Sequence, residues 1–114
     1  MHEVYASDEF DTWYHGLDDA DRRRVTFAVD LLEERGVLLG HPYSSAIKGT
    51  KFPFRELRVQ SEGRPIRIIY AYDPQCDAYL IIGGDKTGDD RFYKHILPLA
   101  QRIWTDYLAN MEGD

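Results

Sequence analysis

The fold is most clearly indicated by the sequence Arg55-Glu-Leu-Arg-Val-Gln-Ser-Glu-Gly-Arg-Pro-Ile-Arg-Ile-Ile-Tyr70. It holds two strand-like runs on either side of Ser61-Glu-Gly-Arg64, and a short glycine-containing turn between such runs is typical of an antiparallel hairpin. We therefore predict strands at residues 55–60 and 65–73, joined by a turn at 61–64. A second turn at 73–77 leads to a third predicted strand at 78–84.

The arginines of this stretch are not all expected on the same face of the sheet, because successive side chains of a strand point to opposite faces. Arg58 shares one face with Glu56 in the first strand, and Arg67 has the matching position in the second. We expect helices to cover the other, apolar face and to leave these three side chains on an uncovered one. The trio is either a cross-strand salt-bridge ladder in solvent or a site for an anion. Arg64 falls in the turn and Arg55 has the parity of the covered face, so neither is assigned to the site.

The flanking sequence has helical spacing. After a short strand at 3–7, Ser7 predicts the start of a helix that ends at Gly16, and the run from Asp18 predicts a second helix that ends at Gly36. Residues 37–54 are expected to form a loop. An apolar stripe predicts a helix within 89–111, with Pro98 near the first turn of its main part because proline disrupts helix interiors.

These elements predict one α+β domain spanning residues 1–114, in the order β-α-α-β-β-β-α. The N-terminal helical hairpin and the C-terminal helix are expected on one face of a small antiparallel sheet. The chain has one cysteine, Cys76, which excludes an internal disulfide framework. No apolar run is long enough to span a membrane and the first residues lack the pattern of a signal peptide, so we expect a cytoplasmic protein.

Charge is distributed unevenly along the chain. The total is −6, with 14 Lys and Arg against 20 Asp and Glu, which argues against non-specific nucleic-acid binding. Residues 48–70, however, hold six basic groups against two acidic ones. Local charge decides what a site attracts, so this basic island is where an anionic ligand is expected.

Two other segments carry candidate ligand-binding residues. Lys48 and Lys51 flank Gly49 in the predicted loop and could hold phosphates, although a solvated loop is an equally good interpretation. The run Ile81-Ile-Gly-Gly-Asp-Lys-Thr-Gly-Asp-Asp-Arg-Phe-Tyr93 ends a strand with two glycines, which allow close approach of a backbone or ligand. Its spacing is not that of a phosphate-binding P-loop. The four histidines lack metal-ligand spacing, so no metal site is predicted.

Four segments in this order resemble the RelE/HigB-like toxins of type II toxin–antitoxin systems, within the RelE/ParE superfamily. They are Ile47-Lys-Gly49, Arg55-Glu-Leu-Arg58, Arg67-Ile-Ile-Tyr-Ala71 and Lys86-Thr87. Each segment is short, but the ordered set and the helices around it extend the resemblance over nearly the whole chain.

The resemblance implies a ribosome-dependent mRNA endonuclease in which a 2′-hydroxyl attacks the neighbouring phosphate without a metal or other cofactor. Such chemistry needs a base, cations for the added phosphate charge and an acid for the leaving oxygen. The implied catalytic residues are Glu56 as base, Arg58 and Arg67 on the phosphate, Lys86 as stabiliser or acid, and Tyr93 as a stacking or proton-donating group. The implied RNA-binding residues are Lys48, Lys51 and Arg91.

The resemblance also implies partners. These are the ribosome, the message, and an antitoxin of acidic or helix-turn-helix type that covers the basic island. Because the chain is acidic overall, we expect weak affinity for free RNA. Two alternatives stay open: a ParE-like relative that poisons gyrase without catalysis, and an inactive domain that only binds an antitoxin.

Overall fold

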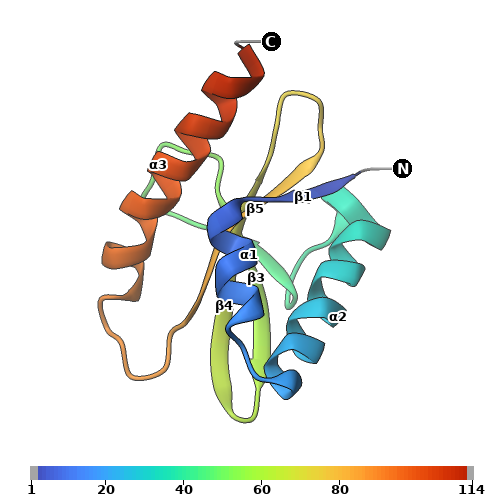
Figure 1. Ribbon diagram of the computed structural model, residues 1–114, viewed down its shortest axis with the longest axis vertical. Helices are drawn as coiled ribbons and strands as arrows, with labels where there is room; N and C mark the ends of the chain where they lie inside the picture. Colours follow the sequence, from blue (N-terminus) through green and yellow to red (C-terminus); the bar gives the residue numbers. More distant parts are fainter. Residues whose placement is uncertain (1–2, 113–114) are drawn as a thin grey trace.

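Five strands form one mixed sheet in a computed structural model that describes residues 3–112 (Figure 1), in the order β1-β5-β4-β3-β2. The strands are β1 Val4–Ala6, β2 Ser44–Ala46, β3 Arg55–Ser61, β4 Arg64–Tyr72 and β5 Ala78–Asp85. The helices are α1 Asp8–His15, α2 Asp19–Arg35 and α3 Phe92–Glu112, with one 3-10 turn, η1 Gly36–Leu38, after α2. The α+β class is confirmed.

The antiparallel β3–β4 hairpin is confirmed, and its strands pair from Arg55↔Tyr70 to Ser61↔Arg64, so the turn is shorter than the predicted 61–64. Its turn residues Glu62 and Gly63 have φ values of 51° and 78°. Positive φ at both central residues is the geometry of the tight turn that matches the twist of paired strands. The pairing places Arg58 directly opposite Arg67.

The two N-terminal helices begin and end where their capping residues predict. The Ser7 hydroxyl accepts from the backbone N–H of Phe10 at 2.9 Å and donates to the carbonyl of Ile81 at 2.6 Å, which ties α1 to the sheet. Asp18 caps α2 by accepting from the Asp21 N–H at 2.9 Å. Gly36 ends α2 with a φ of 56°, a conformation that glycine adopts without steric cost.

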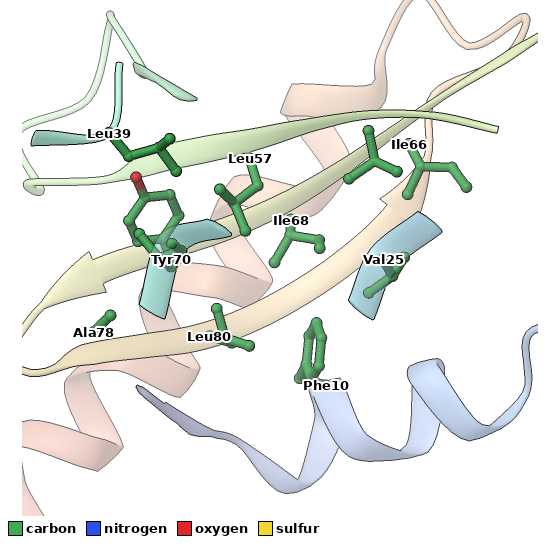
Figure 2. Packing of buried hydrophobic residues seen from close by; sticks show 11 residues of the cluster. Phe10, Val25, Leu39, Leu57, Ile66, Ile68, Tyr70, Ala78 and Leu80 are labelled. Carbon is green, nitrogen blue, oxygen red and sulfur yellow. The ribbon is translucent and has the colours of Figure 1, made fainter. Parts of the chain in front are cut away.

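Helices α1 and α2 cover the sheet face predicted to be apolar. Figure 2 shows Phe10 of α1 and Val25 of α2 directed toward Leu57, Ile66, Ile68, Tyr70 and Leu80 of the central strands. Val25, Leu57, Ile68 and Tyr70 are completely buried. Burial of apolar surface of this kind is the main favourable contribution to folding.

The C-terminal helix lies on the opposite face, so the expectation that all three helices share one face is wrong (Figure 1). The buried side chains of α3 pack against Ile69 and Ala71 of β4 and Tyr79 and Ile81 of β5. These residues make the second face apolar as well, and an apolar surface on both sides of a sheet requires a cover on both sides. Helix α3 therefore covers the sheet face that was expected to be uncovered, except at the margin of that face.

Three further details differ from the prediction. The expected loop 37–54 contains η1 and the edge strand β2, which pairs antiparallel with β3, while β1 pairs parallel with β5, so the sheet is not purely antiparallel. Ser-Ser-Ala, the sequence of β2, has little intrinsic strand preference and becomes a strand because β3 offers it a partner. Pro98 lies inside one continuous helix rather than near its start. None of the helices described is long and apolar enough to cross a membrane.

Candidate active site

Glu56 is the centre of the candidate site. It lies in β3, opposite Ser45 of β2 and Ile69 of β4, and only 8% of the residue is exposed. Its Oε1 accepts a hydrogen bond from the Tyr93 hydroxyl at 2.6 Å, and the Ser45 hydroxyl is 3.5 Å from its Oε2. A buried carboxylate with one strong and one long hydrogen bond keeps an oxygen that can accept a further proton donor.

Arg67 lies beside this carboxylate and is also buried, with 6% of the residue exposed. Its Nη1 donates to the backbone carbonyl of Ile66 at 3.1 Å, and its Nε is 3.8 Å from Oε1 of Glu56. That distance gives electrostatic attraction without a hydrogen bond, and Nε has no hydrogen-bond partner within residues 3–112. Buried donors are nearly always paired, so the guanidinium retains donor capacity that its protein neighbours do not use.

Tyr93 comes from the first turn of α3 and reaches back over the sheet to Glu56. Burial raises the pKa of the Tyr93 hydroxyl, and the hydrogen bond to Glu56 raises that pKa further. The phenol therefore stays protonated at neutral pH and acts as a hydrogen-bond donor. The Nζ of Lys86 lies 5.3 Å from the centre of the Tyr93 ring, within cation–π range.

A hollow of about 250 Å³ opens beside this group. Lys48 lines it together with Glu56 and Tyr93, and its walls are completed by Ala46, Ile47 and Leu97. The structure therefore brings together five residues that the sequence nominated from four separate segments: Lys48, Glu56, Arg67, Lys86 and Tyr93. The hollow provides space for a ligand group next to the Glu56 carboxylate.

Arg58 lies across the hairpin from Arg67, and its side chain is exposed. Like charges directly opposite each other in a sheet repel, which lowers stability unless an anion lies near them. Within the described part of the chain, no hydrogen bond or ion pair engages the Arg58 guanidinium. Arg58 is therefore available to a ligand.

Two predicted RNA-binding residues lie apart from Glu56. Lys51 is exposed and its Nζ is 5.7 Å from the Phe52 ring centre, and Arg91 is exposed just before α3. In residues 3–112, no hydrogen bond or ion pair joins either side chain to Glu56, Arg67 or Tyr93, and neither lines the hollow beside Glu56. Any RNA contact of Lys51 or Arg91 would therefore lie away from the Glu56, Arg67 and Tyr93 side chains.

The glycine pair at the end of β5, Gly83 and Gly84, allows helices on both faces to pack closely against the sheet. The register between β4 and β5 shifts between Ile69 and Tyr70, and Gly83 then faces α1 while Gly84 faces α3. A Cβ on Gly83 would meet the Trp13 ring at 2.3 Å, and one on Gly84 would meet Phe92 at 2.8 Å. Both distances are shorter than van der Waals contact, so glycine is required for the two aromatic rings to approach the sheet.

Sequence reasoning missed Ser45 because β2 was interpreted as loop. It also missed Arg24, His41 and Tyr43, which line a groove with Arg58 and Arg67. Arg24 is the last of three consecutive arginines in α2, a run that is typical of a solvent-exposed helix face. No local sequence pattern relates it to the hairpin. The available signal was that Arg24 lies one helical turn before Ala28, a half-buried residue that packs against the core.

The arrangement suits proton transfer beside a bound anion. Glu56 can accept a proton, Arg58 and Arg67 offer positive charge, and Tyr93 and Lys86 carry protons next to them. Within residues 3–112, no group of three or more His, Cys, Asp or Glu side chains is placed to hold a metal ion.

Comparisons with known proteins place the chain among related sequences. The family described as phage-derived protein Gp49-like (DUF891) matches residues 12–105. The chain is 36% identical over 107 residues to the protein named "Putative toxin HigB3" of Mycobacterium tuberculosis, an alignment that covers 92% of each protein. It is 33% identical over 103 residues to "Putative toxin HigB2" of the same organism, covering 88% of this chain and 51% of that protein.

A solved structure was also compared with the chain. The solution structure of the conserved hypothetical protein HP0894 from Helicobacter pylori aligns with a TM-score of 0.44 and 21% sequence identity. The alignment covers 75% of this chain and 94% of that one.

Proposed function

The chain belongs to the Gp49-like family of RelE/HigB-like toxins, and from that premise we propose that it is an endoribonuclease that cleaves message on the ribosome. It is a toxin of a toxin–antitoxin system, and that class implies an antitoxin partner. The observation that carries the enzymatic proposal is the buried contact of Glu56 with Tyr93 at 2.6 Å and with Arg67 at 3.8 Å.

Glu56 is proposed as the base. Its Oε1 is occupied by the Tyr93 hydroxyl, whereas Oε2 has only the long contact to Ser45. Oε2 is therefore the oxygen that takes the proton of the RNA 2′-hydroxyl. As the proton leaves, the 2′-oxygen bonds to the adjacent phosphorus and the bond from phosphorus to the 5′-oxygen breaks, which leaves a 2′,3′-cyclic phosphate and a 5′-hydroxyl end.

The cations stabilise the charge that develops on phosphate. Arg67 lies next to Glu56 and Arg58 faces Arg67 across the hairpin, so a phosphate between them would relieve the repulsion of the two guanidinium groups. Lys86, beside the Tyr93 ring, is the proposed stabiliser or acid that supplies the proton to the leaving 5′-oxygen. Tyr93 holds the Glu56 carboxylate in place by its hydrogen bond and can donate to the same reaction.

Contacts beyond the cleaved bond are proposed for the remaining basic residues. Lys48 lines the hollow beside Glu56 and would bind a flanking phosphate. Lys51 and Arg91 would contact RNA or ribosome farther away. The antitoxin is proposed to be acidic or of helix-turn-helix type and to cover the basic island, which would block access to Glu56.

The test is cleavage of a defined message by purified protein in a translation mixture with ribosomes. We expect products with 2′,3′-cyclic phosphate and 5′-hydroxyl ends. Replacing Glu56 with Gln removes the base at constant size and should lower the cleavage rate by about 10²–10⁴-fold. Glu62→Gln is the matched control, because Glu62 is exposed in the β3–β4 turn, and it should cleave at the native rate.

A Glu56→Gln variant that cleaves as fast as the native protein would refute the role of Glu56. Absence of cleavage together with blocked DNA supercoiling would instead favour a gyrase poison. Absence of cleavage, of supercoiling block and of growth inhibition would favour an inactive antitoxin-binding domain.

A further inference from the structure

A groove of about 420 Å³ runs along the exposed part of β3, between α2 and the segment before β2. We call it the arginine groove. Its lining residues are Arg24, Phe27, Ala28, His41, Pro42, Tyr43, Arg58, Val59, Gln60 and Arg67. None of them is acidic, although the chain as a whole has a net charge of −6. The volume lies within the range of roughly 300–1,000 Å³ that small-molecule sites occupy.

The arginines of this groove differ from those that hold the fold together. Arg22 pairs with Asp19, Arg55 donates to Ser44 and Tyr70, and Arg64 pairs with Asp21 and Asp85. By contrast, no hydrogen bond or ion pair within residues 3–112 engages the guanidinium of Arg24 or Arg58. The charges of Arg24 and Arg58 are therefore not neutralised by the surrounding protein, whereas Arg67 lies beside Glu56.

Aromatic rings are exposed in the same groove. Phe27 is 62% exposed and Tyr43 is 43% exposed, and both line the groove with the arginines. The backbone of Tyr43 is held on both sides, since its N–H donates to Gly40 at 3.0 Å and its carbonyl accepts from the Arg58 N–H at 2.8 Å. The ring is therefore presented from a fixed position beside the Arg58 backbone.

Unneutralised arginines with exposed rings are the combination that single-stranded nucleic acid requires. The arginines follow the phosphates, and the rings stack on bases that are not paired. A neighbouring hollow of about 480 Å³ is less suitable, because Asp19 and Asp30 line it and would repel phosphate. Arg67 lines the arginine groove, and its Nε lies 3.8 Å from Oε1 of Glu56, so the groove and the proposed base have this arginine as a common neighbour.

We propose that the arginine groove binds the single-stranded RNA next to the cleaved phosphate, with Arg24 on a flanking phosphate and Tyr43 stacked on a base. The proposal rests on the proposed function, because it identifies where the substrate of that reaction continues beyond Glu56. It makes Arg24 and Tyr43 substrate-binding residues on elements outside the hairpin.

The experiment measures binding rather than cleavage. A short single-stranded 2′-O-methyl RNA, which has no free 2′-hydroxyl and cannot be cleaved, is titrated at low ionic strength into the full-length, isotope-labelled protein, and amide shifts are followed by NMR. Tyr43→Ala should weaken binding by about 5- to 100-fold, and Tyr43→Phe should restore it because the ring that stacks is kept. Arg24→Ala should weaken binding and reduce the slope of log affinity against log salt by about 0.7.

Arg23→Ala is the matched control, because it removes the same charge from the adjacent position on α2 but does not line the groove. It should bind nearly as tightly as the native protein. Equal loss in Arg23→Ala and Arg24→Ala would overturn the proposal, since it would show a general charge effect. Native affinity in Tyr43→Ala, or no saturable binding by the native protein, would overturn it as well.

An oligoglutamate peptide serves as the second probe. If it shifted the same amides with the same dependence on Tyr43, the groove would be a site for an acidic polypeptide and the RNA proposal would fail. The RNA result is independent of the cleavage chemistry. Weakened binding in the groove variants without any cleavage on ribosomes would refute only the enzymatic proposal, whereas ribosome-dependent cleavage with unchanged binding in those variants would refute only the groove.

Discussion

Glu56 receives hydrogen-bonding groups from two elements that lie far from it along the chain. Tyr93 arrives from α3 and Ser45 from β2, while Arg67 comes from the neighbouring strand. The carboxylate is buried, and its neighbours are two hydroxyl groups and the Arg67 guanidinium. A buried ion pair of this kind adds little to stability by itself. Its proposed role is chemical, and the contribution of each neighbour can be separated by single substitutions.

Replacing Tyr93 with Phe removes one hydroxyl and keeps the ring beside Lys86 and Phe92. We expect the cleavage rate to fall by about 10²-fold or more, because the donor that orients Glu56 is lost. The free energy of unfolding should change by only about 1 kcal/mol, the usual net value of one hydrogen bond. Cleavage assays with the translation mixture and urea denaturation measure the two effects. Cleavage at the native rate by Tyr93→Phe would show that the ring alone, through stacking, accounts for any role of this residue.

Among the contacts between elements, those of Asp21 join α2 to the β3–β4 hairpin. It is buried at the start of the helix, and it accepts from the Ser61 hydroxyl at 2.5 Å and from Arg64 at 2.6 and 2.7 Å. Arg64 also reaches Asp85 of β5 at 3.0 Å. Four elements, α2, β3, β4 and β5, therefore meet around the Asp21–Arg64 ion pair. The hydrogen bonds from Arg64, and then from Ser61, hold the pKa of Asp21 below its usual value.

Asp21→Asn should remove a pH-dependent part of the stability. A carboxyl whose pKa is lowered by folding stabilises the protein above its unfolded pKa of about 3.9, and this stabilisation is lost as the pH falls through that value toward the folded pKa. The native protein should therefore lose more stability than Asp21→Asn between neutral pH and pH ~3. At neutral pH the variant should be less stable by about 1–3 kcal/mol.

Denaturant unfolding at both pH values measures this difference. Asp19→Asn is the control, because Asp19 makes an exposed ion pair with Arg22, and it should change stability by less than about 1 kcal/mol. If acidification lowered the stability of the native protein and of Asp21→Asn equally, the pH-dependent role of the Asp21 carboxylate would be contradicted.

The contact of α1 with the sheet depends on Gly83. Gly83→Ala puts a methyl group into the space of the Trp13 ring, so α1 must shift, and we expect a loss of about 1–3 kcal/mol in the free energy of unfolding. Gly40→Ala is the matched control, because a Cβ there meets nothing within 4 Å and the backbone needs no positive φ. It should be neutral within about 0.5 kcal/mol. Equal stability of both variants by thermal and urea unfolding would argue against the close approach of Trp13.

At the scale of the whole molecule, one sheet separates two apolar cores. Trp13 packs with the core under α1 and α2, and Trp104 is buried in the core under α3. Both cores use alternate residues of the same strands, such as Ile68 and Ile69 of β4. Loss of either core would expose one whole face of the shared strands, so we expect the two layers to unfold together.

The fluorescence of the two tryptophans can test whether the two layers unfold together. Single-tryptophan variants, Trp13→Phe and Trp104→Phe, leave one fluorescent reporter in each core. For each variant, the fluorescence transition in urea should coincide with the transition seen by circular dichroism, as expected for a two-state domain. Fluorescence that changes at a lower urea concentration than the circular dichroism signal, in either variant, would show that one layer unfolds independently.

Local sequence patterns were sufficient to predict the helix ends and the β3–β4 hairpin. Ser7, Asp18 and Gly36 predicted the helix ends correctly because caps act over three or four residues. The β3–β4 hairpin was predicted because its turn and alternation lie within one short stretch. The same alternation placed Glu56, Arg58 and Arg67 on one face. Arg55 and Arg64 were left out of the site, and both make contacts that hold the fold together.

The sequence by itself therefore determined the hairpin, the helix caps and the shared parity of the charged trio, because each depends on neighbours close along the chain. Tertiary packing was needed to show that α3 covers the second face, that Ser44–Ala46 is a strand, and that Tyr93 bonds to Glu56 while Arg24 lines a groove with Arg67. These contacts join residues that are not neighbours along the chain. They follow from the need to bury apolar surface on both faces of one sheet, a requirement of the assembled molecule that no local pattern expresses.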